Sequence, residues 1–117
     1  MTCRLHTLCI DANDPPRLAR FWAGLLGWEI ADDRLVLLPN DDTGFRIRFQ
    51  PTAEPKVGPN QTHFDLTSAS LEDQQQTVAR ALGLGARHID IGQGDVEWVV
   101  MADPGGNEFC VLPTPAA

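Results

Sequence analysis

The strongest constraint on the fold is an internal repeat in the order of the predicted elements. A short apolar stretch, a helix and three further strand candidates occupy the first half of the 117-residue chain, and the same order recurs in the second half. One such half would leave a sheet face uncovered and is too small to be stable alone. We therefore expect two modules that share a core within one domain.

In the first half, CRLHTLCID at residues 3–11 predicts a strand because it is short, apolar and followed by a turn cluster. Asp14 is suited to cap a helix, and Pro15 is suited to its first position. Apolar residues then recur with helical spacing at Leu18, Phe21, Trp22 and Leu25. Gly27 predicts the end of this helix. Three strand candidates follow at 28–31, 34–38 and 45–49.

The second half begins after a Pro- and Gly-rich linker at about 51–60. The stretch THFDLTS predicts a strand, and Ser68 or Ser70 is expected to cap a helix that runs to about Leu82 and ends at Gly83 and Gly85. Strand candidates follow at 88–91, 96–101 and 108–112, the last two joined by a turn at 103–107. We place module one at about 1–52 and module two at about 61–114.

The two halves also align residue by residue. His6 in HTLCID falls against His63 in HFDLTS, and RIRFQPT falls against EFCVLPT, which pairs Arg48 with Cys110. Strand alternation places Arg46, Arg48 and Gln50 on one face, and Glu108, Cys110 and Leu112 on the corresponding face of the second half. These polar faces are expected to line the hollow between the sheets, where a ligand would bind.

Charge and cysteine content exclude several classes of function. The formal net charge is −7 and no basic cluster occurs, which argues against binding to nucleic acid or to an anionic membrane. Three cysteines without a CxxC motif suggest neither a disulfide framework nor a structural zinc site. With no membrane-spanning stretch and no signal peptide in the sequence, a cytoplasmic location is expected.

Three motifs give the chain a family resemblance. LHTLCI leading into a helix that ends FWAGLLGW, His63 in THFDL, and the terminal DPGGNEFCVL together resemble the vicinal oxygen chelate superfamily of glyoxalase I, extradiol dioxygenases and bleomycin-resistance proteins. The closest similarity is to its small glyoxalase-like domains, and it covers essentially residues 1–117. The resemblance implies an α+β fold in which two tandem βαβββ modules form an incomplete, curved β-barrel around a cavity. It also implies a homodimer.

The metalloenzymes of this superfamily hold a divalent metal with side chains from the first and last strands of each module. His6 and His63 match the two histidine positions, whereas Arg48 and Cys110 stand where glutamates are usual. Arginine cannot ligate a metal and would repel one. The usual ligand quartet is therefore degenerate, and we expect no cofactor.

The preferred function is binding of a small organic molecule in the barrel cavity, with metal-independent binding or catalysis. The candidate cavity residues are His6, Arg46, Arg48, His63, Asp65, Trp98, Glu108 and Cys110. The arginines suit a carboxylate or phosphate, with a solvated or ion-paired surface as the alternative. Cys110 and Trp98 have an alternative as inert core residues, and the histidines as hydrogen-bonded core groups.

Two further functions stay open. The first is a metal-dependent lyase, isomerase or dioxygenase in which His6, His63 and Asp65 hold zinc, nickel, manganese or iron. The second is a drug-sequestering protein of the bleomycin-resistance type. Loss of a bound metal on substitution of His6 or His63 would distinguish the first from the others.

Overall fold

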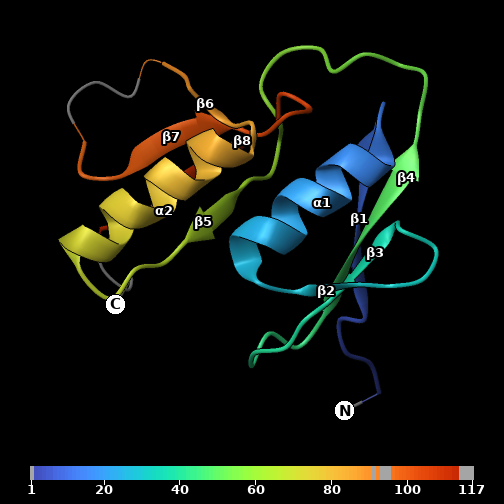
Figure 1. Ribbon diagram of the computed structural model, residues 1–117. Helices are drawn as coiled ribbons and strands as arrows, with labels where there is room; N and C mark the ends of the chain where they lie inside the picture. Colours follow the sequence, from blue (N-terminus) through green and yellow to red (C-terminus); the bar gives the residue numbers. More distant parts are fainter. Residues whose placement is uncertain (1, 91, 93–95, 114–117) are drawn as a thin grey trace. The chain divides into compact units, whose positions relative to one another are not determined.

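The computed structural model describes residues 2–90, 92 and 96–113. The chain divides into two compact units, Met1–Pro55 and Lys56–Ala117. Each unit has the order strand, helix and three strands, and the strands of each form one four-stranded mixed sheet (Figure 1). The predicted α+β class and the repeat of βαβββ modules are thereby confirmed.

The first unit contains five elements. They are β1 (Thr7–Ala12), α1 (Pro15–Leu26), β2 (Glu29–Ile30), β3 (Val36–Leu38) and β4 (Arg46–Pro51). The strand order is β1-β4-β3-β2, with β1 parallel to β4 and the other neighbours antiparallel. The observed β1 is shorter than the predicted strand at 3–11 and leaves His6 just outside it.

The local sequence explains where α1 begins and ends. The side chain of Asp14 accepts a hydrogen bond from the backbone N–H of Arg17, and Pro15 takes the first position, where its missing N–H costs nothing. Gly27 ends the helix in the left-handed conformation (φ 72°), and its N–H donates to the carbonyl oxygen of Ala23 at 2.8 Å. These boundaries confirm the predicted helix.

The second unit also contains five elements. They are β5 (Phe64–Leu66), α2 (Leu71–Leu84), β6 (Arg87–His88), β7 (Val99–Ala102) and β8 (Glu108–Val111), with the strand order β5-β8-β7-β6. Ser70 rather than Ser68 caps α2, because its Oγ accepts from the N–H of Asp73 at 3.1 Å. Gly83 lies within α2, and Gly85 alone ends it (φ 114°). The strand predicted at 88–91 is observed one residue earlier, and Ile91 lies outside the described residues.

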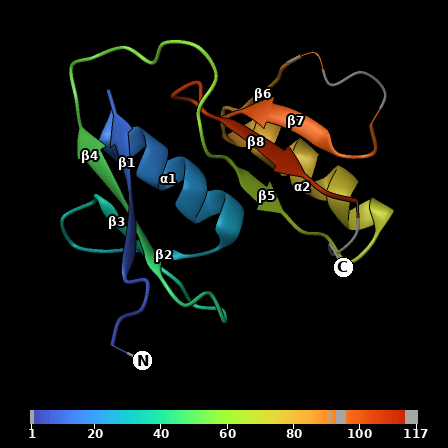
Figure 2. The same cartoon turned by 180° about the vertical axis from the view of Figure 1, so that it is seen from behind.

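In each unit the helix lies across one face of its own sheet, as the two opposite views agree (Figures 1 and 2). The first core contains Leu18, Trp22 and Phe49, and the second contains Phe109 and Val111, all at most 2% exposed. These faces supply the apolar contact that stabilises each helix on its sheet.

One buried amide also fixes α2 to its sheet. Gln74 is 4% exposed, and its Nε2 donates to the carbonyl oxygen of Val111 at 2.9 Å and to that of Glu97 at 3.0 Å. Both hydrogens of this buried amide therefore have acceptors, as a buried polar group requires.

The predicted turn at 103–107 is confirmed. Asp103 is 1% exposed, and its Oδ1 accepts from the backbone N–H groups of Gly105 and Asn107, both at 2.9 Å. The carboxylate thus satisfies the backbone donors of the turn, which explains the Asp-Pro-Gly-Gly-Asn sequence without any ligand.

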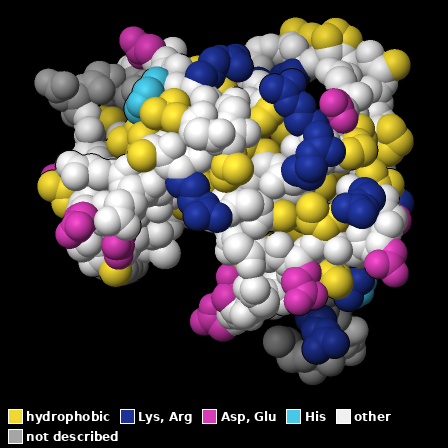
Figure 3. All heavy atoms as spheres, in the orientation of Figure 1, with side chains coloured by type: hydrophobic (Ala, Val, Ile, Leu, Met, Phe, Trp, Pro, Cys, Tyr) yellow, Lys and Arg dark blue, Asp and Glu magenta, His cyan; other side chains and the backbone are white. Residues whose placement is uncertain are grey.

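Charged side chains of both signs are scattered among polar and apolar atoms on the face shown in Figure 3, with many of its Lys and Arg side chains over the first unit. No helix in the described part of the chain has the length and apolar character needed to cross a membrane.

Candidate functional site

The face of the first sheet that points away from α1 carries polar side chains of β4. Arg46 and Arg48 are exposed and Gln50 is half-buried, whereas Ile47 and Phe49 alternate with them and are 2% and 0% exposed. The predicted alternation along this strand is confirmed. Among the described residues, neither guanidinium group has an ion pair, so both can bind an anion.

The pairing of β1 with β4 adds a thiol to this face. Thr7 is the partner of Arg46, and Cys9 is the partner of Arg48. Directly paired residues of neighbouring strands point to the same side of a sheet, so the exposed Cys9 lies beside Arg48. The sequence analysis missed Cys9 because its neighbour depends on strand register, which no local pattern reveals.

His6 precedes β1 and is exposed. Its carbonyl oxygen accepts from the N–H of Arg46 at 3.0 Å, and its Nδ1 lies 2.6 Å from Oγ1 of Thr7. His6 therefore lies one residue before Thr7, which is the residue that pairs with Arg46.

The alignment of His6 with His63 is wrong by one residue. Cys9 pairs with Arg48 in the first sheet, and Asp65 pairs with Cys110 in the second. Because Arg48 and Cys110 are equivalent positions of β4 and β8, Cys9 is equivalent to Asp65. His63, two residues before Asp65, then corresponds to Thr7. The alternation in residues 3–11 is too weak to fix this register from the sequence.

The second sheet gathers three of the predicted residues into a cluster. Nε2 of His63 lies 3.1 Å from Oδ1 of Asp65, and β8 places Cys110 directly beside Asp65. One ligand atom from each of the three residues lies within 4.8 Å of the other two. The side chains of His63 and Asp65 are half exposed, whereas Cys110 is only 7% exposed.

Cys110 is held as a neutral thiol. Burial raises its pKa above the ordinary value, and the negative charge of Asp65 and a hydrogen bond to that carboxylate raise it further. A nucleophilic cysteine needs the opposite environment, with a cation or base that favours the thiolate. The arrangement therefore speaks against Cys110 as a nucleophile.

The cluster offers an incomplete match to a metal site. Imidazole, carboxylate and thiolate are all ligands of zinc, and three protein ligands with one open position are typical of catalytic zinc. However, the thiol would have to lose a proton that its surroundings retain, since metal ligands bind deprotonated. Manganese prefers oxygen ligands, of which this cluster has only one carboxylate.

The carboxylate of Glu108 accepts hydrogen bonds from residues of its own unit. Its Oε1 accepts from Nζ of Lys56 at 3.2 Å, and its Oε2 accepts from the N–H of Asn60 at 3.0 Å. Burial acts to raise the pKa of Glu108, but the hydrogen bonds from Asn60 and Lys56, with the charge of Lys56, outweigh it and lower that pKa. This carboxylate ties the segment before β5 to β8.

Trp98 immediately precedes β7 and is 41% exposed. It lies in a bend just outside the strand, where strand alternation does not apply. Within the second unit, strand alternation places Asp65, Cys110 and Glu108 on one face, and His63 lies against Asp65. Arg46, Arg48 and His6 belong to the first unit.

Two βαβββ modules are the fold expected from the resemblance to the vicinal oxygen chelate superfamily. The family of glyoxalase-like domains matches residues 7–112 of the sequence, and the chain belongs to this family. No curated protein matches the chain in sequence.

Solved structures share the fold at low sequence identity. Oxidase ChaP-H2 is 20% identical, with a TM-score of 0.70 over 100% of this chain and 98% of that chain. A glyoxalase/bleomycin resistance protein from Albidiferax ferrireducens T118 is 17% identical, with a TM-score of 0.66 over 94% and 98%. The fosfomycin resistance protein FosX from Listeria monocytogenes, determined with Mn(II) and a dihydroxypropylphosphonic acid, is 13% identical, with a TM-score of 0.68 over 98% and 92%.

Proposed function

We propose that the chain binds a small organic molecule at the polar face of its second sheet, with His63, Asp65 and Cys110 as the binding centre and no resident metal. One observation carries the proposal. Nε2 of His63 lies 3.1 Å from Oδ1 of Asp65, and Cys110 is paired directly with Asp65 on the neighbouring strand, so an imidazole, a carboxylate and a thiol meet at one point of the sheet.

The cluster is suited to proton transfer. When Nε2 of His63 donates to Asp65, Nδ1 keeps its lone pair for a ligand. The carboxylate would stabilise the imidazolium that forms when His63 accepts a proton. The proposed chemistry is therefore acid–base catalysis, or hydrogen-bonded binding alone, on a ligand with an acidic C–H or O–H group.

A divalent-metal enzyme is the second candidate, and the close approach of three donor types favours it. His63, Asp65 and Cys110 would hold the cation, with zinc as the best match to this set. Bound zinc would polarise an oxygen of the substrate as a Lewis acid.

Metal titration with a matched control separates these candidates. Calorimetry with Zn²⁺, Ni²⁺, Mn²⁺ and Fe²⁺ is expected to give no stoichiometric binding to the wild-type protein. The metal candidate requires about one ion per chain, lost in His63→Ala and retained in His88→Ala, where a histidine outside the cluster is removed. That result would refute the metal-free proposal.

The exposed arginines of the first sheet form a separate candidate site, for an anionic group. Arg46 and Arg48 suit a carboxylate or phosphonate, and FosX from Listeria monocytogenes was determined with a phosphonic acid. Dihydroxypropylphosphonate and acetate are therefore suitable probes for ligand-detected NMR. We expect Arg48→Gln to weaken their binding and Arg87→Gln, on β6, to leave it unchanged; equal effects would refute a role for the first sheet.

The homodimer expected from the resemblance also belongs to this proposal. Light scattering at two protein concentrations tests it, and a monomer at both would refute it.

A further inference from the structure

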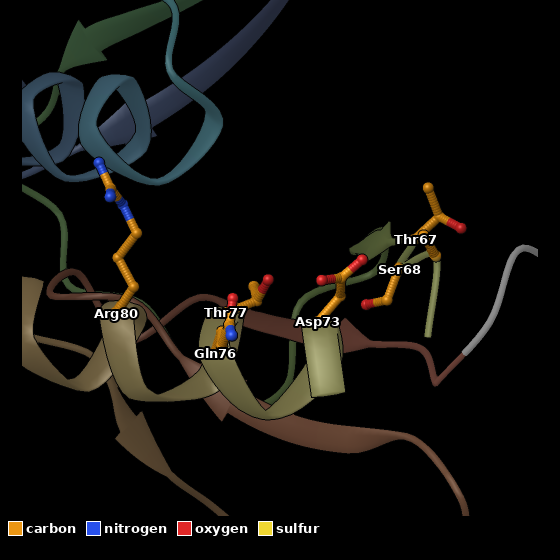
Figure 4. Close-up of a pocket in the computed structure, with 7 residues that line it drawn as sticks. Thr67, Ser68, Asp73, Gln76, Thr77 and Arg80 are labelled. Atoms are coloured by element: carbon orange, nitrogen blue, oxygen red, sulfur yellow. The ribbon is translucent and has the colours of Figure 1, made fainter. Parts of the chain in front are cut away.

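A groove lies along α2, with a volume of about 430 Å³. Thr67 and Ser68 of the segment after β5 line one side. Asp73, Thr77 and Arg80 of α2, at spacings of four and three residues, line the other. Figure 4 shows Arg80, Thr77 and Asp73 in this order along the helix, with Ser68 facing the Asp73 end.

The hydroxyl group of Ser68 makes this groove more than a surface hollow. Ser68 is 6% exposed, and its Oγ has no hydrogen-bond partner among the described residues. A buried hydroxyl without a partner is costly and uncommon, which suggests that a bound group normally supplies the partner. Figure 4 shows this Oγ turned toward the side of the groove that carries Asp73.

The charges at the Ser68 end favour a cation. Among the described residues, the exposed carboxylate of Asp73 has no ion pair, and the hydroxyl of Thr77 adds a further acceptor. A protonated amine has three donors and no acceptor, which matches this set. The helix N-terminus contributes only about half a positive charge, which the carboxylate of Asp73 outweighs.

The opposite end of the groove favours an anion. Arg80 follows Asp73 by seven residues, or about 10 Å along the helix axis. Arg80 takes part in a further contact within the protein, but its five N–H donors allow more than one partner. An extended peptide of three residues has its ammonium and carboxylate ends about 10 Å apart.

We propose that the groove binds a small zwitterion, such as a short peptide, with its ammonium group at Asp73, Ser68 and Thr77 and its carboxylate toward Arg80. This groove lies along α2, on the side of the sheet that the helix covers. The His63 cluster lies on the opposite side of the same sheet, so the two sites are separate.

Triglycine is the probe that tests this proposal, with binding followed by NMR of backbone amides. We expect shifts confined to residues 67–69 and α2, and loss of binding for N-acetyltriglycine, which has no ammonium group. Asp73→Asn should raise the Kd about tenfold or more, since a hydrogen bond to a charged group is lost. His63→Ala should leave the Kd unchanged.

Glu72→Gln is the matched control, because it removes the same charge from the neighbouring residue, which does not line the groove. We expect this variant to keep most of the affinity. The proposal is refuted if triglycine does not bind at millimolar concentration, if N-acetyltriglycine binds equally well, or if Glu72→Gln weakens binding as much as Asp73→Asn. Unchanged unfolding midpoints of both variants would show that affinity, rather than folding, is measured.

Discussion

Replacing Ser68 by alanine should stabilise the ligand-free protein. The hydroxyl is buried and unpaired, and an unsatisfied buried polar group costs about 1–3 kcal/mol. Alanine removes the oxygen and leaves the rest of the side chain in place. We therefore expect the free energy of unfolding to rise by about 1 kcal/mol, which for a chain of this length raises the Tm by about 4 °C.

Ser70→Ala is the matched comparison, two residues away. The hydroxyl of Ser70 accepts from the N–H of Asp73 at the start of α2, and loss of such a cap costs about 1 kcal/mol. Urea and thermal unfolding, followed by circular dichroism, should thus shift in opposite directions for the two variants. Destabilisation by Ser68→Ala of the same size as by Ser70→Ala would show that the Ser68 hydroxyl is already paired, and would refute the reasoning.

Three other predictions concern single groups. Glu108→Gln should lower the free energy of unfolding by about 1–2 kcal/mol at pH 7; because the pKa of Glu108 is lowered in the folded protein, this difference should disappear as the pH falls through that pKa, and a constant difference in urea unfolding would contradict it. The raised pKa of Cys110 stabilises the fold below the ordinary thiol pKa of 9.0, and this contribution is lost as the pH rises above it. The wild-type Tm should therefore fall more steeply above pH 9 than that of Cys110→Ala, and parallel curves would count against the shift. Asp103→Ala should cost about 3 kcal/mol in chemical unfolding, since it leaves buried backbone donors of the turn unpaired, and a loss below 1 kcal/mol would disprove that role.

Local patterns in the sequence predicted most of the fold. The cap at Asp14, the stop at Gly27 and the alternation along β4 each depend on residues close together in the chain, so the sequence reveals them directly. Their order, repeated twice, was enough to predict the βαβββ modules.

The parts that depend on register were not predictable in the same way. The alignment of His6 with His63 was wrong by one residue, because β1 begins at Thr7 and pairs with β4 one residue away from the expected position. The sequence predicted that His63 and Asp65 lie on one face, because they are two residues apart on a strand. That Cys110 pairs directly with Asp65 could be known only from the register of the sheet. The groove at Ser68 requires the orientation of α2 against the preceding segment, which no periodicity supplies.

The two hydrogen bonds to Glu108 have a consequence for how such a chain evolves. In a protein built from two copies of one module, the joining segment must be inherited with one copy or the other. Because Lys56 and Asn60 both bond to Glu108 of β8, residues 56–60 belong with the second unit, and a cut between Pro55 and Lys56 would keep Glu108 with both of its partners. Recombination at the end of the Pro- and Gly-rich stretch would separate Glu108 from both of its partners.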